Sequence, residues 1–134
     1  MYKKDYIQRQ FEDFGKVLAS LLQLRRAKNW EEFEKEISNA FVNFIPVAEN
    51  EVEKMDTRSF KDKVVNSNDL PFRIKKILAS LLFEKMNAAL ESNNEQRYRT
   101  LHEKCLMLYE KIQNDQTENE FDLDVHYKLK MLRD

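Results

Sequence analysis

The sequence has 134 residues, of which 42% are hydrophobic and 35% charged, with a net charge of −1 at neutral pH. An apolar fraction this high excludes a disordered chain, and the near-neutral balance provides no overall field for nucleic acid or an anionic membrane. One glycine and two prolines are too few for the turns of a sheet protein, so the composition predicts an all-α fold.

The single cysteine, Cys105, excludes an internal disulfide framework and is typical of a reducing compartment. The N-terminal stretch carries charges where a signal peptide needs its apolar core, and the chain has no apolar run long enough for a membrane span. We therefore expect a soluble cytoplasmic protein without a membrane partner.

The first helix is predicted from about Asp5 to Ala27, because its apolar residues recur at spacings of three and four. Gly15 interrupts this helix, and we interpret it as a position that permits close approach of another helix. The residues that define the stripe are Ile7, Phe11, Phe14, Leu18 and Leu21, widened by Val17, Leu22 and Leu24.

Asn29 is a good N-cap for a second helix, with Glu32 at the position of the reciprocal acid of a capping box. Pro46 ends that helix nearby. A first α-hairpin is therefore expected over about residues 5–45. Its second helix carries the apolar residues Trp30, Phe33, Ile37, Ala40, Phe41 and Phe44.

Residues 46–69 form the least periodic part and are predicted as an irregular connection. One or two helical turns could open at Asp56, with Phe60 and Val64 facing inward. Asp69 is then expected to cap the next long helix, with Pro71 tolerated in its first turn.

A second α-hairpin is predicted over about residues 70–113, with its turn at the two asparagines before Glu95. The apolar positions of its first helix are Ile74, Ile77, Leu78, Leu81 and Leu82, and those of its second helix are Tyr98, Leu101, Cys105, Leu108 and Ile112.

The terminal segment, residues 117–134, fits two periods. Residues 121–131 alternate as a strand does, but Phe121, Val125, Leu129 and Leu132 also lie at helical spacing. We predict a helix beginning between Thr117 and Asp124, with Thr117 and Glu120 as a capping box; an intermolecular strand is the alternative. The whole chain is then a single domain, 1–134, of five or six helices.

Two nearly identical stretches, Lys16–Leu24 and Lys76–Glu84, lie 60 positions apart, whereas the asparagine turns at Asn29 and Asn94 lie 65 apart. Five residues rotate a helix face by about 140°. We therefore interpret the similarity of the two stretches as convergence on good helix formers. The repeating unit is instead the helical hairpin.

Residues 90–112, LESNNEQRYRTLHEKCLMLYEKI, resemble the turn and second helix of tetratricopeptide-type helix pairs. Ala40 and Cys105 match the small residue that this family places late in the second helix. The N-terminal half, from KKDYIQRQFEDFGKVLASLL onward, resembles a group of short uncharacterised bacterial proteins with a tetratricopeptide-like end. The resemblance implies a helical scaffold that binds protein partners, and it implies no activity or cofactor.

His102 and Cys105 share a helix face and could, with His126, bind a metal or act as a base and nucleophile. Tetrahedral zinc normally needs three or four ligands, and no glycine-rich turn offers an oxyanion hole. We therefore predict no enzyme, no metal and no cofactor, and keep a metal or enzyme site at His102 and Cys105 as the alternative.

A basic group comprising Arg73, Lys75, Lys76, Arg97 and Arg99 could bind phosphates weakly, but two solvated helix faces are the better explanation. We expect no nucleic-acid partner.

The remaining hypothesis is a protein–protein interaction module that binds an unknown protein or peptide. Its candidate partner-binding residues are Trp30, Phe33, Tyr98, His102 and Tyr109. Because the terminal segment is apolar on more than one face, we also expect a homodimer through the first helix or that segment.

Overall fold

The computed structural model describes residues 2–116 and 122–134, with side chains described in these ranges except at positions 2–5 and 7. The chain forms two compact units, Met1–Pro46 and Val47–Asp134. The expected single domain, 1–134, stays a prediction.

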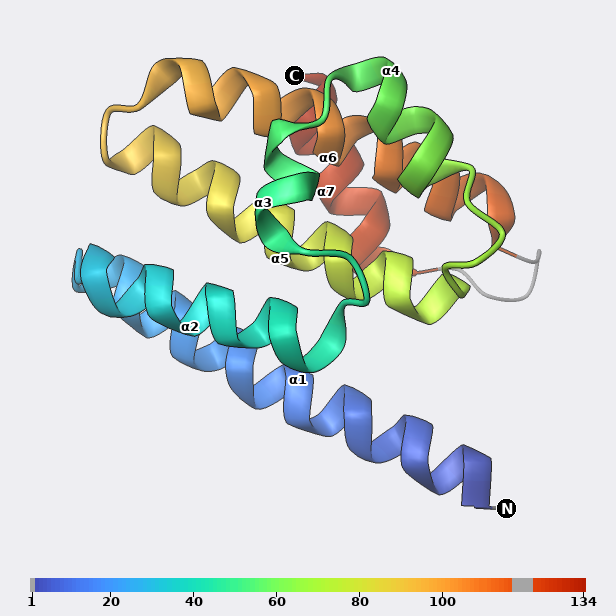
Figure 1. The fold of residues 1–134 in the computed structure, drawn as a ribbon. Coiled ribbons are helices and arrows are strands. Elements are labelled where there is room, and N and C mark those ends of the chain that lie inside the picture. Colours follow the sequence, from blue (N-terminus) through green and yellow to red (C-terminus); the bar gives the residue numbers. More distant parts are fainter. Residues whose placement is uncertain (1, 117–121) are drawn as a thin grey trace. The chain divides into compact units, whose positions relative to one another are not determined.

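All regular structure in the described residues is helical, which confirms the all-α class (Figure 1). Unit 1 holds α1 (Tyr2–Arg26) and α2 (Trp30–Phe44). Unit 2 holds α3 (Glu49–Lys54), α4 (Thr57–Phe60), the π-helical turn η1 (Lys61–Val65), α5 (Phe72–Glu91), α6 (Glu95–Asp115) and α7 (Leu123–Arg133). The described ranges thus contain seven α-helices, where the sequence predicted five or six. None of these helices is long and apolar enough to cross a bilayer.

Unit 1 is the predicted α-hairpin. The rings of Phe14 and Phe44 meet edge to face at 5.4 Å, and the Ser20 hydroxyl donates a hydrogen bond of 2.8 Å to Glu36. The side chain of Asn29 accepts from the backbone N–H of Glu32, as an N-cap should. The fully buried side chains of this unit include Leu21, Phe33 and Ile37.

Both hairpins turn in the same way. Lys28 and Asn93 adopt left-handed backbone angles, φ 56° and 65°, and the next residue in each case, Asn29 or Asn94, donates its backbone N–H to a carbonyl five residues earlier. This is the Schellman geometry of a helix end. The two turns lie 65 residues apart, which is the offset between hairpins that Asn29 and Asn94 predicted from the sequence.

The echoed stretches occupy different environments. In α1, Leu18 is half-buried and Ala19 exposed, whereas in α5 the corresponding Leu78 and Ala79 are fully buried. The identical residues therefore do not occupy equivalent places.

Gly15 lies exposed in α1, and a Cβ added there would meet nothing within 4 Å. The close helix approach expected at this position is therefore absent from the described part of the chain. A glycine inside a helix costs about 1 kcal/mol relative to alanine, so Gly15 weakens α1 without a packing gain in these residues.

Unit 2 is built on the antiparallel hairpin of α5 and α6, with α7 packed against α6 (Figure 1). Phe83 of α5 and Tyr109 of α6 meet edge to face at 6.3 Å. The ammonium of Lys128, on α7, lies 5.0 Å from the centre of the Phe83 ring and 5.7 Å from that of Tyr109. Cation–π contacts thus help to fix α7 on the hairpin.

The connection between the hairpins is more ordered than predicted. The carboxylate of Asp56 accepts from the backbone N–H of Ser59 at 2.7 Å and caps α4, and Phe60 and Val64 are fully buried, as expected. The predicted cap at Asp69 is wrong, because Pro71 itself occupies the N-cap position of α5. An extended residue is favoured before a helix, and the fixed φ of proline suits that position.

Helix α3 was not predicted at all. It buries one apolar residue, Val52, and is held by two lysines from the hairpin. Lys85, 1% exposed, lies 2.6 Å from Glu49 and 2.8 Å from Glu53. Lys104, 2% exposed, donates to the backbone carbonyls of Val52 and Glu53 at 2.9 and 2.7 Å.

The last helix confirms the preferred interpretation of the terminal segment. Helix α7 begins at Leu123, inside the predicted interval, and Asp122 caps it by accepting from the backbone N–H groups of Asp124 and Val125. The capping box proposed for Thr117 and Glu120 lies outside the described residues.

We expect Lys85→Met to lower the free energy of unfolding by about 2 kcal/mol, because it removes the ammonium group that pairs with both Glu49 and Glu53. Urea denaturation followed by circular dichroism would measure the change. Lys35→Met is the matched control, since Lys35 is exposed and lies 3.6 Å or more from its acidic neighbours; about 0.3 kcal/mol is expected there. Equal effects of both substitutions would contradict the anchoring role of Lys85.

We also expect unit 2 to lose stability in acid. Burial raises the pKa of Glu53, but the hydrogen bonds and charges of Lys85 and Arg97 outweigh it, so the pKa falls below the usual 4.5. A depressed carboxyl pKa contributes stability that is complete above pH 4.5 and is lost as the pH falls through the lower folded value. Glu53→Gln should therefore flatten the pH dependence of the unfolding free energy below about pH 5. An unchanged slope would contradict the ion pairing.

Candidate functional site

The five predicted partner-binding residues divide between the units. Phe33 is 0% and Tyr109 1% exposed, so these two side chains have no surface to offer a partner in this structure. Burial raises the pKa of Tyr109 well above its usual value, with Cys105 as a smaller cause, so its phenol stays neutral. Both residues belong to helix packing.

The other three candidates are half-buried. Trp30 lies at the start of α2, with its ring 6.1 Å from that of Phe33. Tyr98 and His102 occupy successive turns of α6, with ring centres 5.7 Å apart. They keep accessible edges, but Trp30 belongs to unit 1 and the other two belong to unit 2.

The chemistry considered for Cys105 is opposed by its surroundings. The thiol is fully buried in α6, and burial raises its pKa far above the usual range, so the thiolate needed for attack or metal binding is strongly disfavoured. His102 is half-buried, while His126 is exposed on α7. In residues 2–116 and 122–134, no group of three or more histidine, cysteine or acidic side chains is placed to hold a metal ion.

The basic group proposed for phosphate binding is mostly engaged within the protein. Lys76 pairs with Asp122 at 2.7 Å, Arg97 with Glu53 at 2.7 Å, and Arg99 with Glu95 at 2.7 Å. Lys75 is 6% exposed, and burial, with the charge of Lys111, lowers its pKa. Arg73 is half-buried.

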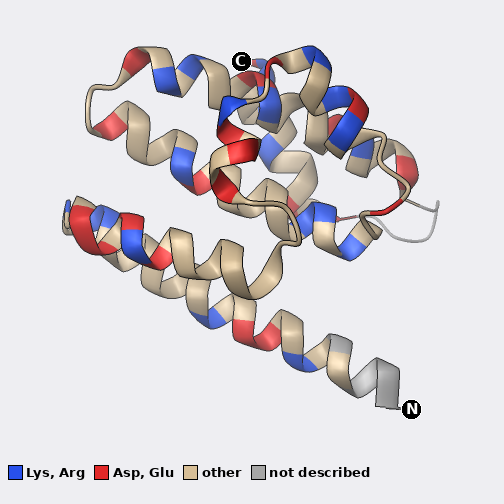
Figure 2. Ribbon diagram, in the orientation of Figure 1, with Lys and Arg blue, Asp and Glu red and all other residues tan. Residues whose placement is uncertain are grey.

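Acidic and basic residues are also interspersed along the helices, as Figure 2 shows. A nucleic-acid surface needs unpaired cations gathered on one face. The described residues provide no such face among the five predicted cations.

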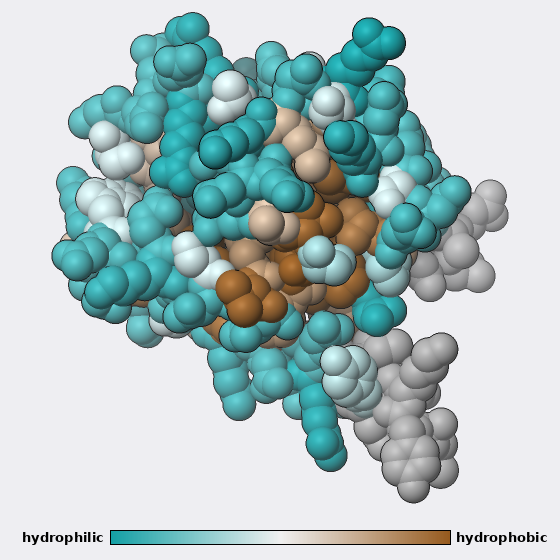
Figure 3. Space-filling view, in the orientation of Figure 1, coloured by the Kyte–Doolittle hydropathy of each residue, from teal (hydrophilic) through white to brown (hydrophobic). Residues whose placement is uncertain are grey.

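Hydrophilic residues cover most of the face drawn in Figure 3. Exposed apolar side chains are therefore better candidates for a binding surface than the charged groups. Three of them lie four residues apart on α7: Leu123, Tyr127 and Met131 are 55%, 56% and 61% exposed. This spacing places them on one side of the helix, and we call them the outer stripe of α7. Other exposed large hydrophobic residues in the described chain are Tyr6, Phe11, Val42 and Leu90.

The outer stripe is additional to what α7 needs for packing. A separate set, Val125, Leu129 and Leu132, is 1–3% exposed and faces the hairpin. The sequence predicted apolar residues on more than one face of this segment, and the described part of α7 confirms it. No candidate residue was named on the outer stripe, although the four-residue spacing from Leu123 was present in the sequence.

Charges border the outer stripe unequally. The exposed residues His126, Lys130 and Arg133 run along one edge at spacings of four and three. Arg133 lies 3.9 Å from Glu110, and Lys130 forms no ion pair with a described residue. On the other edge, Asp124 and Lys128 neutralise each other at 3.0 Å. The stripe therefore has one basic and one neutral edge.

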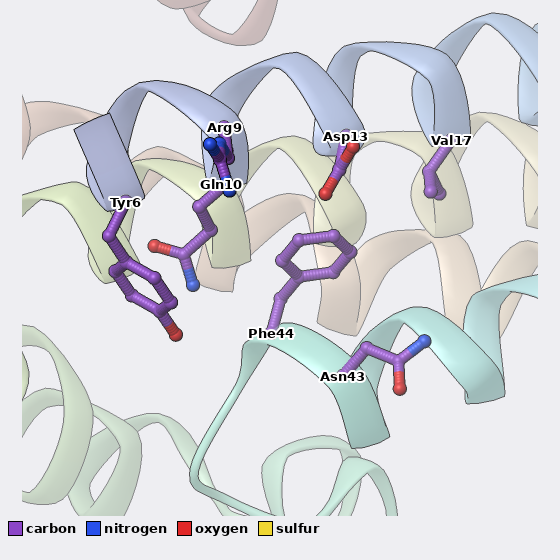
Figure 4. A pocket seen from close by; sticks show the side chains of 7 residues that line it. All are labelled: Tyr6, Arg9, Gln10, Asp13, Val17, Asn43 and Phe44. Atoms are coloured by element: carbon purple, nitrogen blue, oxygen red, sulfur yellow. The ribbon is translucent and has the colours of Figure 1, made fainter.

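Unit 1 contains an open groove of about 520 Å³ between the two helices. Figure 4 shows the ring of Phe44 rising between Gln10 and Asp13, with the Gln10 amide directed toward the groove. Gln10 Oε1 is buried and accepts no hydrogen bond from a described residue. Tyr6, Arg9, Gln10, Asp13 and Val17 of α1 and Asn43 and Phe44 of α2 line the groove. One cation, one carboxylate and two aromatic rings do not indicate a particular ligand.

Comparison of this chain with protein-family models, with curated proteins and with solved structures finds no match. The surfaces of the two units are therefore the features from which a function can be proposed.

The burial of Cys105 can be tested directly. We expect its thiol to react with an aromatic disulfide reagent at least a hundredfold more slowly in the native protein than in urea, because reaction requires α6 to open. A spectrophotometric thiol assay measures both rates, and a short cysteine-containing peptide controls for the effect of urea on the reagent. Rapid native reaction would restore Cys105 as a candidate nucleophile.

Proposed function

We propose that this chain is a protein–protein interaction module of the tetratricopeptide-like, helical-hairpin type, with no catalytic chemistry of its own. The supporting observation is the outer stripe of α7: Leu123, Tyr127 and Met131 are each more than half exposed. Large apolar side chains aligned on one face mark interaction sites more often than isolated ones do. We place the protein in the cytoplasm, as its single cysteine suggests, and in bacteria, as its resemblance to short bacterial proteins suggests.

The outer stripe suits a short partner segment. Tyrosine and methionine supply large contact area, and the phenol of Tyr127 adds a hydrogen-bonding group. The eight helical steps from Leu123 to Met131 span about 12 Å, which matches two turns of a docked helix or a few residues of an extended peptide.

The basic edge of the stripe indicates the charge of the partner. Lys130 and Arg133 lie beside the apolar residues, so a segment with acidic residues next to its apolar positions would fit both features. We therefore propose an acidic, amphipathic protein segment as the ligand.

The proposal predicts that Tyr127→Ala combined with Met131→Ala weakens partner binding at least tenfold, about 1.4 kcal/mol, because aromatic anchors dominate such contacts. Partners captured from native lysate by wild-type protein would be purified and titrated against both proteins by calorimetry. Leu90→Ala is the matched control, since Leu90 is an exposed apolar residue, 51% accessible, on α5.

The stripe variant should retain the wild-type circular dichroism, because both replaced side chains are exposed. Equal affinity of wild-type and stripe variant for every captured partner would refute the proposed surface. Binding of α7 to anionic lipid vesicles instead of protein would refute the proposed class of ligand.

A further inference from the structure

Gly15 is the only glycine in the sequence, and it lies in the middle of α1. Its backbone angles are helical, so no turn requires it, and an added Cβ would meet nothing within 4 Å. Nothing in the described residues explains a glycine at this exposed position. Glycine in a helix permits another backbone to approach closely, which points to a contact beyond those within unit 1.

Gly15 belongs to an apolar row that flanks the side of α1 packed most deeply in unit 1. Phe11, Gly15, Leu18 and Leu22 recur at spacings of four, three and four, so they share one side of α1. Phe11 is 38% exposed, and Leu18 and Leu22 are half-buried. The most deeply packed residues of α1, Phe14, whose ring meets Phe44, and Leu21, which is fully buried, lie beside this row, about 60° further round the helix.

We propose that two copies of this chain associate through this row, with their α1 helices antiparallel and crossing at Gly15. The absent side chain lets the two backbones approach at the crossing point. On either side of it, Phe11 of one copy packs against Leu18 of the second copy, and the two-fold axis repeats the contact. The spacing of four, three and four is the one that an antiparallel helix pair requires.

The charges beside the row complement this arrangement. Glu12 and Lys16 lie on the same edge of the row and are exposed. Neither forms an ion pair with a described residue; Glu12 accepts only a 3.4 Å hydrogen bond from Gln8. An antiparallel pair places equal edges together, so Glu12 of one copy comes within reach of Lys16 of the second copy, and the reverse pair forms symmetrically.

A second copy fits α1 better than it fits α7. Antiparallel pairing of two outer stripes would bring the edges that carry Lys130 and Arg133 together and oppose like charges. The row on α1 pairs opposite charges in the same geometry. The two surfaces are therefore distinct, and this inference does not rest on the function proposed for α7.

The test is sedimentation equilibrium of the full chain over a range of concentrations. The wild-type protein should approach twice the 16.2 kDa chain mass at high micromolar concentration. Gly15→Leu should weaken dimerisation at least tenfold by blocking the crossing, while circular dichroism shows equal or greater helicity, because leucine is the better helix former. Asp13→Leu, at an exposed position on the side of α1 opposite the row, is the matched control and should dimerise like wild type.

Charge exchange tests the orientation. Glu12→Lys and Lys16→Glu should each weaken the dimer about threefold or more, and the double variant should restore wild-type affinity, because the opposite pair is re-formed. A monomer at every concentration would overturn the proposal. So would a Gly15→Leu variant that dimerises like wild type, or a double charge variant no tighter than its single parents.

Discussion

The buried ammonium group of Lys85 needs acidic partners, and this need determines how part of unit 2 is arranged. An ammonium group with 1% exposure cannot remain charged in a core unless acidic oxygens accompany it. Glu49 and Glu53 supply these oxygens, and both belong to α3, so pairing the lysine also places this short helix. Lys104 completes the attachment by donating to the carbonyls at the end of α3, where a helix presents its negative pole. Helix α3 is therefore held in place by these charged and hydrogen-bonded lysines as well as by Val52, its one buried apolar residue.

This mode of attachment explains which parts of the fold the sequence could predict. The long helices follow from apolar spacing, and the cap at Asn29, the turn at Asn94 and the helix start at Asp56 follow from local hydrogen bonding; all three are present. Helix α3 could not be predicted, because it buries only Val52 and periodicity treats the lysines that hold it as solvent-facing residues. A lysine on a helix becomes a core residue only when a distant segment brings its counter-charge.

The candidate residues divide for a related reason. Aromatic side chains suit a core and a surface equally, and only their neighbours decide between the two. Phe33 and Tyr109 pack inside their units, whereas Tyr127 lies outward on a helix whose opposite side already supplies Leu129. An apolar side chain is available for binding when the packing of its helix does not require it, whether or not it is aromatic. The same criterion applies to Gly15, which contributes neither packing nor a turn.

The buried lysines also bear on the order in which the chain folds. Each hairpin closes through a turn of a few residues, and such local contacts form early and quickly. Lys85 and Lys104 must lose their bound water before α3 can dock. They form replacement hydrogen bonds with α3 only at the end of that step. Desolvation without immediate compensation raises a barrier. Docking of α3 should therefore be the slow step for unit 2, and its detachment the first event when the folded unit begins to open.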